Sequence, residues 1–96
     1  MGLDQYLTHN NPDYLNPGIN STEIAYWRKD WDLHHFIGSD NCESVEITED
    51  ICNEILENLD LIYKENDYYK SETYDAFIKA KELIQSGEEV YYEADW

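Results

Sequence analysis

The residues of this chain that are best suited to chemistry lie in one short segment, from Arg28 to Cys42. The segment contains Asp32, two adjacent histidines at His34 and His35, and the thiol of Cys42. Imidazole, thiolate and carboxylate groups are the usual ligands of zinc, and a cysteine beside a histidine can act as a nucleophile. These residue types therefore raise two possibilities, a metal site and a cysteine–histidine pair.

The spacing of these residues argues against both possibilities. Short zinc motifs pair their ligands as C-x₂-C or H-x₃-H, and the segment contains neither pair. Adjacent helical residues point about 100° apart, so His34 and His35 cannot both face one metal. We expect one histidine to pack against Trp31 and the other to face solvent. Nothing in the segment indicates an oxyanion hole, and acidic surroundings disfavour a thiolate.

We therefore expect a protein that is not an enzyme and that needs no metal or cofactor. The alternative is a small metal-binding protein or enzyme that uses the same segment. Its functional residues would be Arg28, His34, His35 and Cys42.

The charge of the chain points to a partner protein. The sequence carries 22 Asp and Glu residues against 6 Lys and Arg, a formal net charge of −16 at pH 7. Such a protein repels nucleic acids and anionic membranes and attracts basic surfaces. We therefore expect no direct binding to nucleic acid or membrane, and a partner that itself binds nucleic acid. The alternative explanation is that the acidic residues only keep the protein soluble.

The clearest acidic pattern lies on a helix predicted from Glu49 to about Asn66. Asp50, Glu54 and Glu57 follow the spacing i, i+4, i+7, and Lys64 is the only base of this helix. An ordinary exposed face would place lysines four residues away, because like-charge pairs cost about 0.2–0.5 kcal/mol each. The row rises about 10 Å along the helix. Such a row can imitate a DNA backbone to a protein that grips DNA with Lys and Arg.

The predicted partner-binding surface combines acidic residues with tyrosines. Four tyrosines are expected to supply the desolvated anchors that give such an interface its affinity: Tyr68, Tyr69, Tyr91 and Tyr92. The acidic residues would speed association and make it depend on salt. The predicted residues are Glu46, Asp50, Glu54, Glu57, Asp60, Tyr68, Tyr69, Glu89, Tyr91 and Glu93.

Apolar periodicity indicates which elements position these side chains. Strands are expected over residues 2–7, 24–27, 43–47 and 88–96, and helices over residues 28–38, 49–66 and 72–85. Residues 8–20 hold both prolines and are predicted to form a loop. This order predicts a single α+β domain over residues 1–96, with a small antiparallel β-sheet packed against about three helices.

Caps and core positions are predicted with these elements. Gly38 is expected to end the first helix, Thr48 to cap the second and Ser71 to cap the third. Cys52 falls on the apolar stripe of the second helix and is expected in the core. The predicted inner face of the third helix is Tyr74, Phe77, Ile78 and Ile84. The first strand is predicted to place Leu3, and with it Gln5 and Leu7, on one face, and the last strand to place Val90, Tyr92 and Ala94 on one face with Tyr91 and Glu93 on the other.

The composition also bears on where the protein acts. No apolar run approaches the ~18 residues of a transmembrane helix, and the N-terminus lacks the basic and apolar regions of a signal peptide. Two cysteines do not make a disulfide framework. We therefore expect a cytoplasmic protein with free thiols.

Two motifs of the chain resemble a family of small bacteriophage-encoded proteins. The first is MGLD-x-YL at residues 1–7, and the second is AYWRK at residues 25–29, which leads into the stretch with His34, His35 and Cys42. The family has no assigned chemistry. The resemblance implies a phage origin and a place in the cytoplasm of an infected bacterial host.

In size and charge the chain is similar to phage anti-CRISPR and anti-restriction proteins that mimic DNA. The predicted function is therefore inhibition of a host defence or nucleic-acid-processing protein by covering its nucleic-acid-binding surface. A structural or regulatory phage protein whose acidic residues are only solubilising remains a further alternative.

Overall fold

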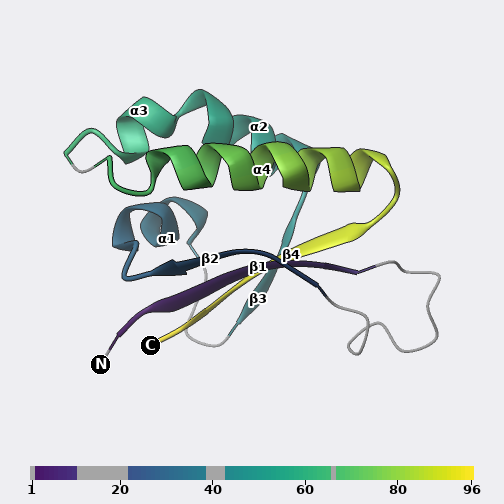
Figure 1. The fold of residues 1–96 in the computed structure, drawn as a ribbon, viewed down its shortest axis with the longest axis horizontal. Coiled ribbons are helices and arrows are strands. Elements are labelled where there is room, and N and C mark those ends of the chain that lie inside the picture. Colours follow the sequence, from purple (N-terminus) through teal and green to yellow (C-terminus); the bar gives the residue numbers. More distant parts are fainter. Residues whose placement is uncertain (1, 11–21, 39–42, 66) are drawn as a thin grey trace.

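A computed structural model describes residues 2–10, 22–38, 43–65 and 67–96 of the chain. It shows a four-stranded antiparallel sheet with all of its described helices on one face, which confirms the predicted α+β class (Figure 1). The elements are β1 (Asp4–Asn10), β2 (Thr22–Arg28), α1 (Trp31–Ile37), β3 (Ser44–Ile47), α2 (Glu49–Glu57), α3 (Leu59–Ile62), α4 (Lys70–Gln85) and β4 (Glu89–Asp95).

The strand order places the first and last strands in the centre of the sheet. The order is β2-β1-β4-β3, and every neighbouring pair is antiparallel. The β1–β4 pairing runs from Asp4 opposite Asp95 to Asn10 opposite Glu89. The strands β2 and β3 therefore form the two edges, and among the described elements none covers the face opposite the helices (Figure 1).

The core lies between the sheet and the helices, and strand alternation decides which side chains enter it. The shared faces predicted for the first and last strands are confirmed, because six residues are fully buried together: Leu3, just before β1, and Gln5, Leu7, Val90, Tyr92 and Ala94. The burial of Tyr92 means that its predicted role as an anchor for a partner is wrong. Trp27 of β2 is also fully buried, and its ring stacks on Phe77 of α4 with centroids 6.0 Å apart. Cys52 is fully buried, as predicted. Burying side chains of this size stabilises the fold by about 1.5–3 kcal/mol each.

The second predicted helix is interrupted at Asn58, so the prediction of one helix over residues 49–66 is wrong. Asn58 takes φ −111° and ψ 16° and separates α2 from the short α3. Its side-chain amide donates to the carbonyl of Glu54 at 2.7 Å. Asparagine side chains compete in this way with the helical hydrogen bonds, which is why they favour helix ends. Thr48 caps α2 as predicted, accepting from the amide of Ile51 at 3.3 Å.

Other boundaries also differ from the prediction. The first helix begins at Trp31, and Arg28, predicted as its start, belongs to β2, which itself begins at Thr22. The strand β1 continues to Asn10, because residues 8–10 pair with β4, although these residues were predicted as loop. The helix α4 begins at Lys70, so Ser71 lies inside it and does not cap it. Gly38 ends α1 with φ +82°, as predicted, a backbone region that glycine enters without strain.

The inner face of α4 is turned by one residue from the predicted one. Tyr74 was predicted to face the core but is half exposed, and Thr73 is fully buried in its place. Ala76 and Ala80 are buried with Phe77. These small residues let the helix lie close to the sheet.

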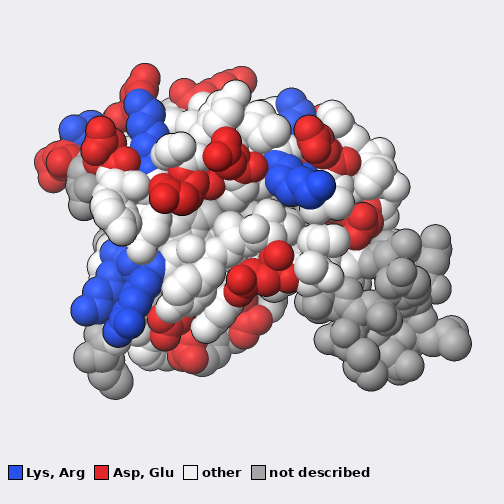
Figure 2. Space-filling model, viewed as in Figure 1, with Lys and Arg blue, Asp and Glu red and all other residues white. Residues whose placement is uncertain are grey.

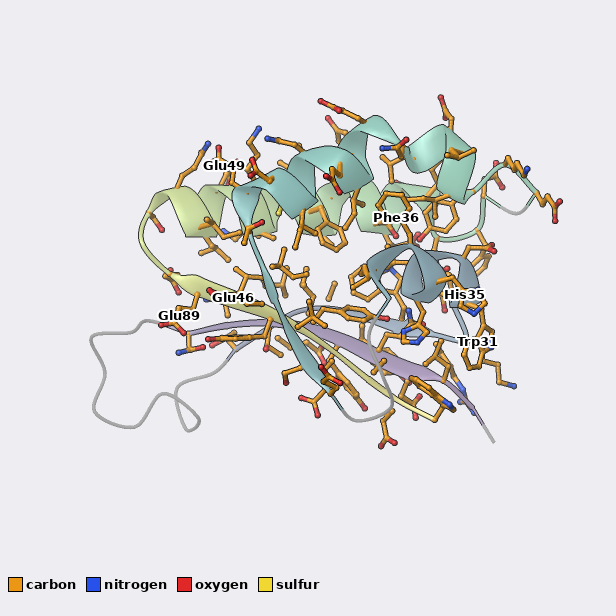
Figure 3. The ribbon with its side chains drawn as sticks, turned by 180° about the vertical axis from the view of Figure 1, so that it is seen from behind. Trp31, His35, Phe36, Glu46, Glu49 and Glu89 are labelled. Carbon is orange, nitrogen blue, oxygen red and sulfur yellow. The ribbon has the colours of Figure 1, made fainter. Side chains whose placement is uncertain are left out.

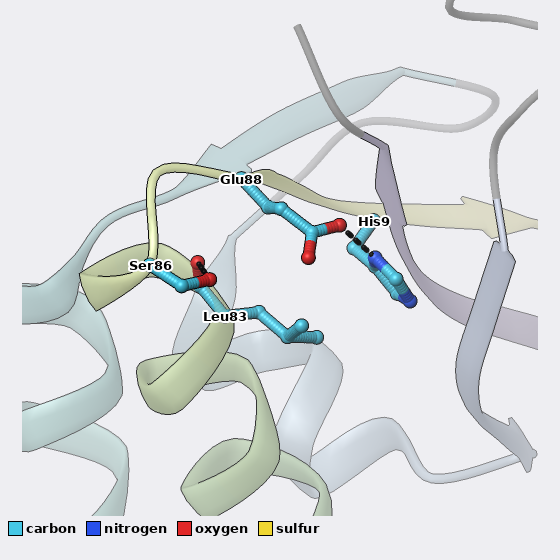
Figure 4. Close-up of polar contacts among 4 residues, drawn as sticks. All are labelled: His9, Leu83, Ser86 and Glu88. Carbon is cyan, nitrogen blue, oxygen red and sulfur yellow. Dashed lines mark hydrogen bonds and ion pairs between the residues drawn. The ribbon is translucent and has the colours of Figure 1, made fainter.

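A tight connection leads from α4 into β4. The hydroxyl of Ser86 donates to the carbonyl of Leu83 at 2.8 Å, and Gly87 follows with φ +98°. Glu88 then reaches across to β1, where its carboxylate lies 2.6 Å from Nδ1 of His9 (Figure 4). The connection thereby holds the start of β4 beside the end of β1.

Candidate protein-binding surface

Basic residues are confined to a few parts of this fold, whereas acidic residues occur in every described element. The four elements β3, α2, α3 and β4 contain nine Asp and Glu residues and no Lys or Arg. The six bases lie elsewhere: Arg28, Lys29, Lys64, Lys70, Lys79 and Lys81. Figure 2 shows a group of basic side chains at the end of the sheet where β2 leads into α1. These four elements therefore carry acidic and no basic side chains; β1 and α1 likewise lack Lys and Arg but hold only one acid each, Asp4 and Asp32.

Three of the predicted site residues form an exposed row on α2. Asp50, Glu54 and Glu57 are all exposed, as the amphipathic pattern predicts, and we call them the α2 row. The row ends with the helix at Glu57. Asp60 lies beyond the break on α3 and is paired with Lys70, so its charge is partly balanced within the protein.

Four other predicted residues come together on the uncovered face of the sheet. Glu46 of β3 lies opposite Tyr91 of β4, and Glu93 lies opposite Ser44. The hydroxyl of Tyr91 donates to Glu89 at 2.5 Å, and this hydrogen bond raises the pKa of Tyr91 to about 12. We call this group the acidic sheet face: Glu46, Glu89, Tyr91 and Glu93.

The acidic sheet face and α2 are connected through the chain at the β3 edge. The strand β3 ends at Ile47, and only Thr48 separates it from the first turn of α2. Figure 3 shows Glu46 and Glu89 beside one another on neighbouring strands, with Glu49 above them on α2. Acidic side chains therefore continue around this edge from one layer to the other.

Three residues that extend the acidic sheet face were missed by the sequence reasoning. Tyr6 of β1 lies opposite both Glu93 and Tyr26, and the two tyrosine rings are 5.2 Å apart. Tyr26 is 44% exposed and donates to Asp4 at 2.5 Å, which raises the pKa of its hydroxyl. The alternation of side chains along β1 could have identified Tyr6. It places Tyr6 on the face of the sheet away from the buried Leu7.

Tyr68 and Tyr69 lie in a different place from the other predicted residues. They precede α4, with rings perpendicular to each other and centroids 4.8 Å apart. The hydroxyl of Tyr69 is held by the backbone of Arg28, donating to its carbonyl at 3.1 Å and accepting from its amide at 3.2 Å. The two tyrosines therefore belong to the corner between β2 and α1. Tyr68 is 73% exposed there.

The histidines of the alternative site have separate environments. One histidine, His34, is buried and the other, His35, is exposed, as predicted. The ring centroid of Trp31 lies 5.8 Å from that of each histidine, and Figure 3 shows Trp31 beside the exposed His35. Burial, with a smaller contribution from His35, lowers the pKa of His34. Among the described residues there is no group of three or more potential metal ligands. Cys42 lies outside the described residues, so the structure does not describe a pairing between it and either histidine.

A buried hydrogen-bond network, which the sequence reasoning missed, fixes the corner beside α1. Trp27 Nε1 donates to the hydroxyl of Thr73 at 3.0 Å, and that hydroxyl lies 2.7 Å from the hydroxyl of Tyr63. Tyr63 in turn donates to Asp30 at 2.5 Å. The other carboxylate oxygen of Asp30 accepts from the amide of Leu33 and caps α1. Burial raises the pKa of Asp30 and the pKa of Tyr63.

A second branch of the network reaches the centre of the sheet. The side-chain amide of Gln5 donates to the carbonyl of Asp30 and to the hydroxyl of Tyr92, both at 3.0 Å. Tyr92 accepts one hydrogen bond from Gln5, and its own hydroxyl can donate one to Nδ1 of His34, 3.0 Å away. Nδ1 of a neutral His34 can accept this hydrogen bond, in agreement with the lowered pKa of His34.

Comparisons with known proteins do not add a family to these observations. Searches of protein-family models, of curated proteins and of solved structures each find no match to this chain. Among the described helices, none is both long and apolar enough to cross a membrane.

Proposed function

We propose that this protein is a non-enzymatic inhibitor that covers the nucleic-acid-binding surface of a partner protein as a DNA mimic. The partner is a defence or nucleic-acid-processing protein of the bacterial host, as in anti-CRISPR and anti-restriction inhibition. The observation that carries the proposal is the purely acidic composition of β3, α2, α3 and β4. Most of these charges lie on two surfaces that join at one edge of the sheet.

The electrostatic repulsion within this acidic surface supports a binding function for it, because the repulsion lowers the stability of the fold. Like charges that are not interspersed with bases repel one another and destabilise the compact state. The α2 row has no base at a neighbouring helical position on its own helix. A surface that served solubility alone would not need to exclude lysine from four elements, because mixed charges also keep a protein soluble.

The spacing of the charges also supports DNA mimicry. Alternate residues of an antiparallel strand lie about 7 Å apart, so Glu89, Glu93 and Asp95 follow one face of β4 at intervals of about 14 Å and 7 Å. These intervals equal the rise of about four and two nucleotides along one DNA strand, at ~3.4 Å each. Basic side chains spaced for phosphates would therefore meet carboxylates at similar intervals.

The tyrosines of the uncovered face supply contacts that charge alone does not. Tyr6, Tyr26 and Tyr91 stand among the acidic residues of the sheet, and the first two are more than one third exposed. Tyrosine is among the residues that most often carry the binding energy of a protein interface. In this arrangement the carboxylates steer the partner and the rings anchor it.

A capture experiment with charge-reversed variants tests the proposal. The tagged protein is incubated with host lysate at low and high salt, with and without competing duplex DNA. We expect capture of a nucleic-acid-binding protein that both salt and DNA displace. Two triple variants replace the acids by lysine, one in the α2 row and one at Glu46, Glu89 and Glu93, and at least one should lose capture.

The matched control reverses three exposed acids on α4, an element that has its own lysines. Glu72, Asp75 and Glu82 are replaced by lysine, which changes the net charge by the same amount. This variant should retain capture. Equal capture by all three variants, or a captured partner that duplex DNA does not displace, would contradict the proposed function.

A further inference from the structure

A small pocket lies at the corner between β2, α1 and the start of α4. Its volume is about 70 Å³, several times the ~10–15 Å³ that one water molecule needs. It is more enclosed than the shallow hollows that the described residues form elsewhere on the surface. The residues that line it are Lys29, Asp30, Asp32, Tyr63, Tyr68 and Tyr69.

Three aromatic rings line this pocket, and two of them are held in place. The hydroxyl of Tyr63 is fixed by Asp30, and the hydroxyl of Tyr69 is fixed by the backbone of Arg28. The ring of Tyr68 stands perpendicular to Tyr69 and is largely exposed, so it forms the rim. The faces of tyrosine rings attract cations. A group that entered the pocket would therefore meet preorganised aromatic walls.

The carboxylates of the pocket favour a cation over an anion. Asp30 is only 5% exposed, and Asp32 lies two residues further on in the first turn of α1. Each carboxylate oxygen of Asp30 already accepts one hydrogen bond. An ionised carboxylate offers about four acceptor positions, so capacity remains for a donor from outside the protein.

The one base that lines the pocket is directed toward the N-terminal segment. Cε of Lys29 lies 3.4 Å from the position that a β-carbon on Gly2 would occupy. The two carboxylates therefore outnumber one ammonium group whose stem runs toward Gly2. Burial raises the pKa of Asp30, which means that the folded protein holds this charge at a cost that a bound cation would reduce.

We propose that this pocket binds the guanidinium group of an arginine side chain. A guanidinium group is planar, so it can stack against a tyrosine ring while its fork of N–H groups reaches a carboxylate. The proposal deepens the proposed function, on which it rests, because a protein that grips DNA presents arginines on its binding surface. The pocket would give Tyr68 and Tyr69 a contact with the partner at a corner separate from the acidic sheet face and the α2 row.

A titration of the isolated protein tests the pocket without any partner. N-acetyl-arginine methylamide is added to ¹⁵N-labelled protein and the amide resonances are followed by NMR. The matched ligands are the lysine derivative and the citrulline derivative, which keeps the shape of arginine but has no charge. We expect saturable shifts at Asp32, Tyr68 and Tyr69 with arginine, weaker binding of lysine and no saturable binding of citrulline.

Substitutions of the residues that line the pocket test whether the arginine derivative binds there. Tyr68→Ala should lower the affinity for the arginine derivative by about two- to fivefold, as expected for a single exposed cation–π contact. Tyr68→Phe should bind the derivative with the wild-type affinity, because it keeps the ring. Asp32→Asn should also weaken binding. Tyr74→Ala is the control. Tyr74 is also an exposed tyrosine, on the neighbouring helix α4, but it does not line this pocket.

The outcomes of the two experiments separate the two proposals. Citrulline binding as tightly as arginine, lysine binding as tightly as arginine, or Tyr68→Ala binding normally would each overturn the arginine pocket. If the pocket fails while the charge-reversed variants lose their partner, the proposed function stands alone. If arginine binds but lysate yields no nucleic-acid-binding partner, the pocket stands and the proposed function fails.

Discussion

The substitution Tyr63→Phe removes one hydroxyl from the centre of the buried network and leaves the ring in place. That hydroxyl donates to Asp30 at 2.5 Å and lies 2.7 Å from the hydroxyl of Thr73. Tyr63 and Asp30 are each only 5% exposed, so water cannot readily replace the lost donor. The variant therefore leaves a buried carboxylate with one hydrogen bond fewer.

The expected loss of stability follows from the kind of hydrogen bond removed. A hydrogen bond to a charged group contributes about 1.5–3 kcal/mol, and a buried acceptor that loses its donor also bears its desolvation cost. We expect Tyr63→Phe to lower the free energy of unfolding by about 1.5–3 kcal/mol at pH 7. For a domain of this size, each kcal/mol lowers Tm by about 4–8 °C.

Urea unfolding followed by circular dichroism measures this loss, with Tyr74→Phe as the control. Tyr74 is half exposed on α4, so loss of its hydroxyl should change the free energy by less than about 0.5 kcal/mol. A double-mutant cycle with Asp30→Asn should show coupling, because the two side chains are in contact. If Tyr63→Phe is as stable as the wild type, or if its effect simply adds to that of Asp30→Asn, the network does not stabilise the fold as argued.

Three further predictions concern acidity, thiol reactivity and salt. The raised pKa of Asp30 means that its contribution to stability is complete below its unfolded value, near 3.8, and is lost as pH rises through the folded value. As pH rises from 3 to 7, urea unfolding should therefore show the free energy of unfolding of the wild type falling relative to that of Asp30→Asn. A difference between the two free energies that does not change with pH would contradict this. Burial raises the pKa of Cys52 to about 11, so in a Cys42→Ser variant Ellman's reagent should react only after unfolding, and rapid labelling of the folded protein would contradict the burial. Added NaCl should raise Tm by screening repulsion among the acidic residues, and an unchanged Tm would mean that this repulsion is already negligible.

Local patterns predicted those parts of the fold that local forces decide. The alternation of Val90, Tyr92 and Ala94 identified the buried face of β4, because a half-buried strand has a period of two. Thr48 and Gly38 marked helix ends because a capping hydroxyl and a positive φ are properties of single residues. These features were predictable without knowledge of the partners of each element.

The features that were missed depend on contacts between distant segments. Tyr74 fitted the apolar stripe of α4 as well as Thr73 did, but Thr73 faces inward because Trp27 and Tyr63 supply partners for its hydroxyl. Asp30 gave no signal in the sequence, since its partners Gln5 and Tyr63 lie 25 and 33 residues away. The composition and the local spacing of residues do not indicate contacts between segments so far apart in the sequence.

The candidate surface was predictable in its residues but not in its arrangement. The acidic row of α2 follows from helical periodicity alone. The acidic sheet face requires the strand register, because Glu46 meets Tyr91 only through the β3–β4 pairing. Tyr68 and Tyr69 were assigned to the same interface by composition, and the structure places them at a separate corner.

The acidic surface and the buried network have opposite effects on the folded state. Repulsion within the α2 row and across the β3 edge opposes folding, so the stability of the chain must come from the aromatic core and from the polar network that joins β1, α1, α4 and β4. A basic partner would relieve that repulsion on binding, because each contact replaces a like-charge neighbour with an opposite charge. Salt acts on both processes with opposite signs: it should stabilise the free protein and weaken its complex. A surface that was merely solubilising would show only the first effect, so measuring Tm and partner affinity over the same salt series separates the two explanations of the charge.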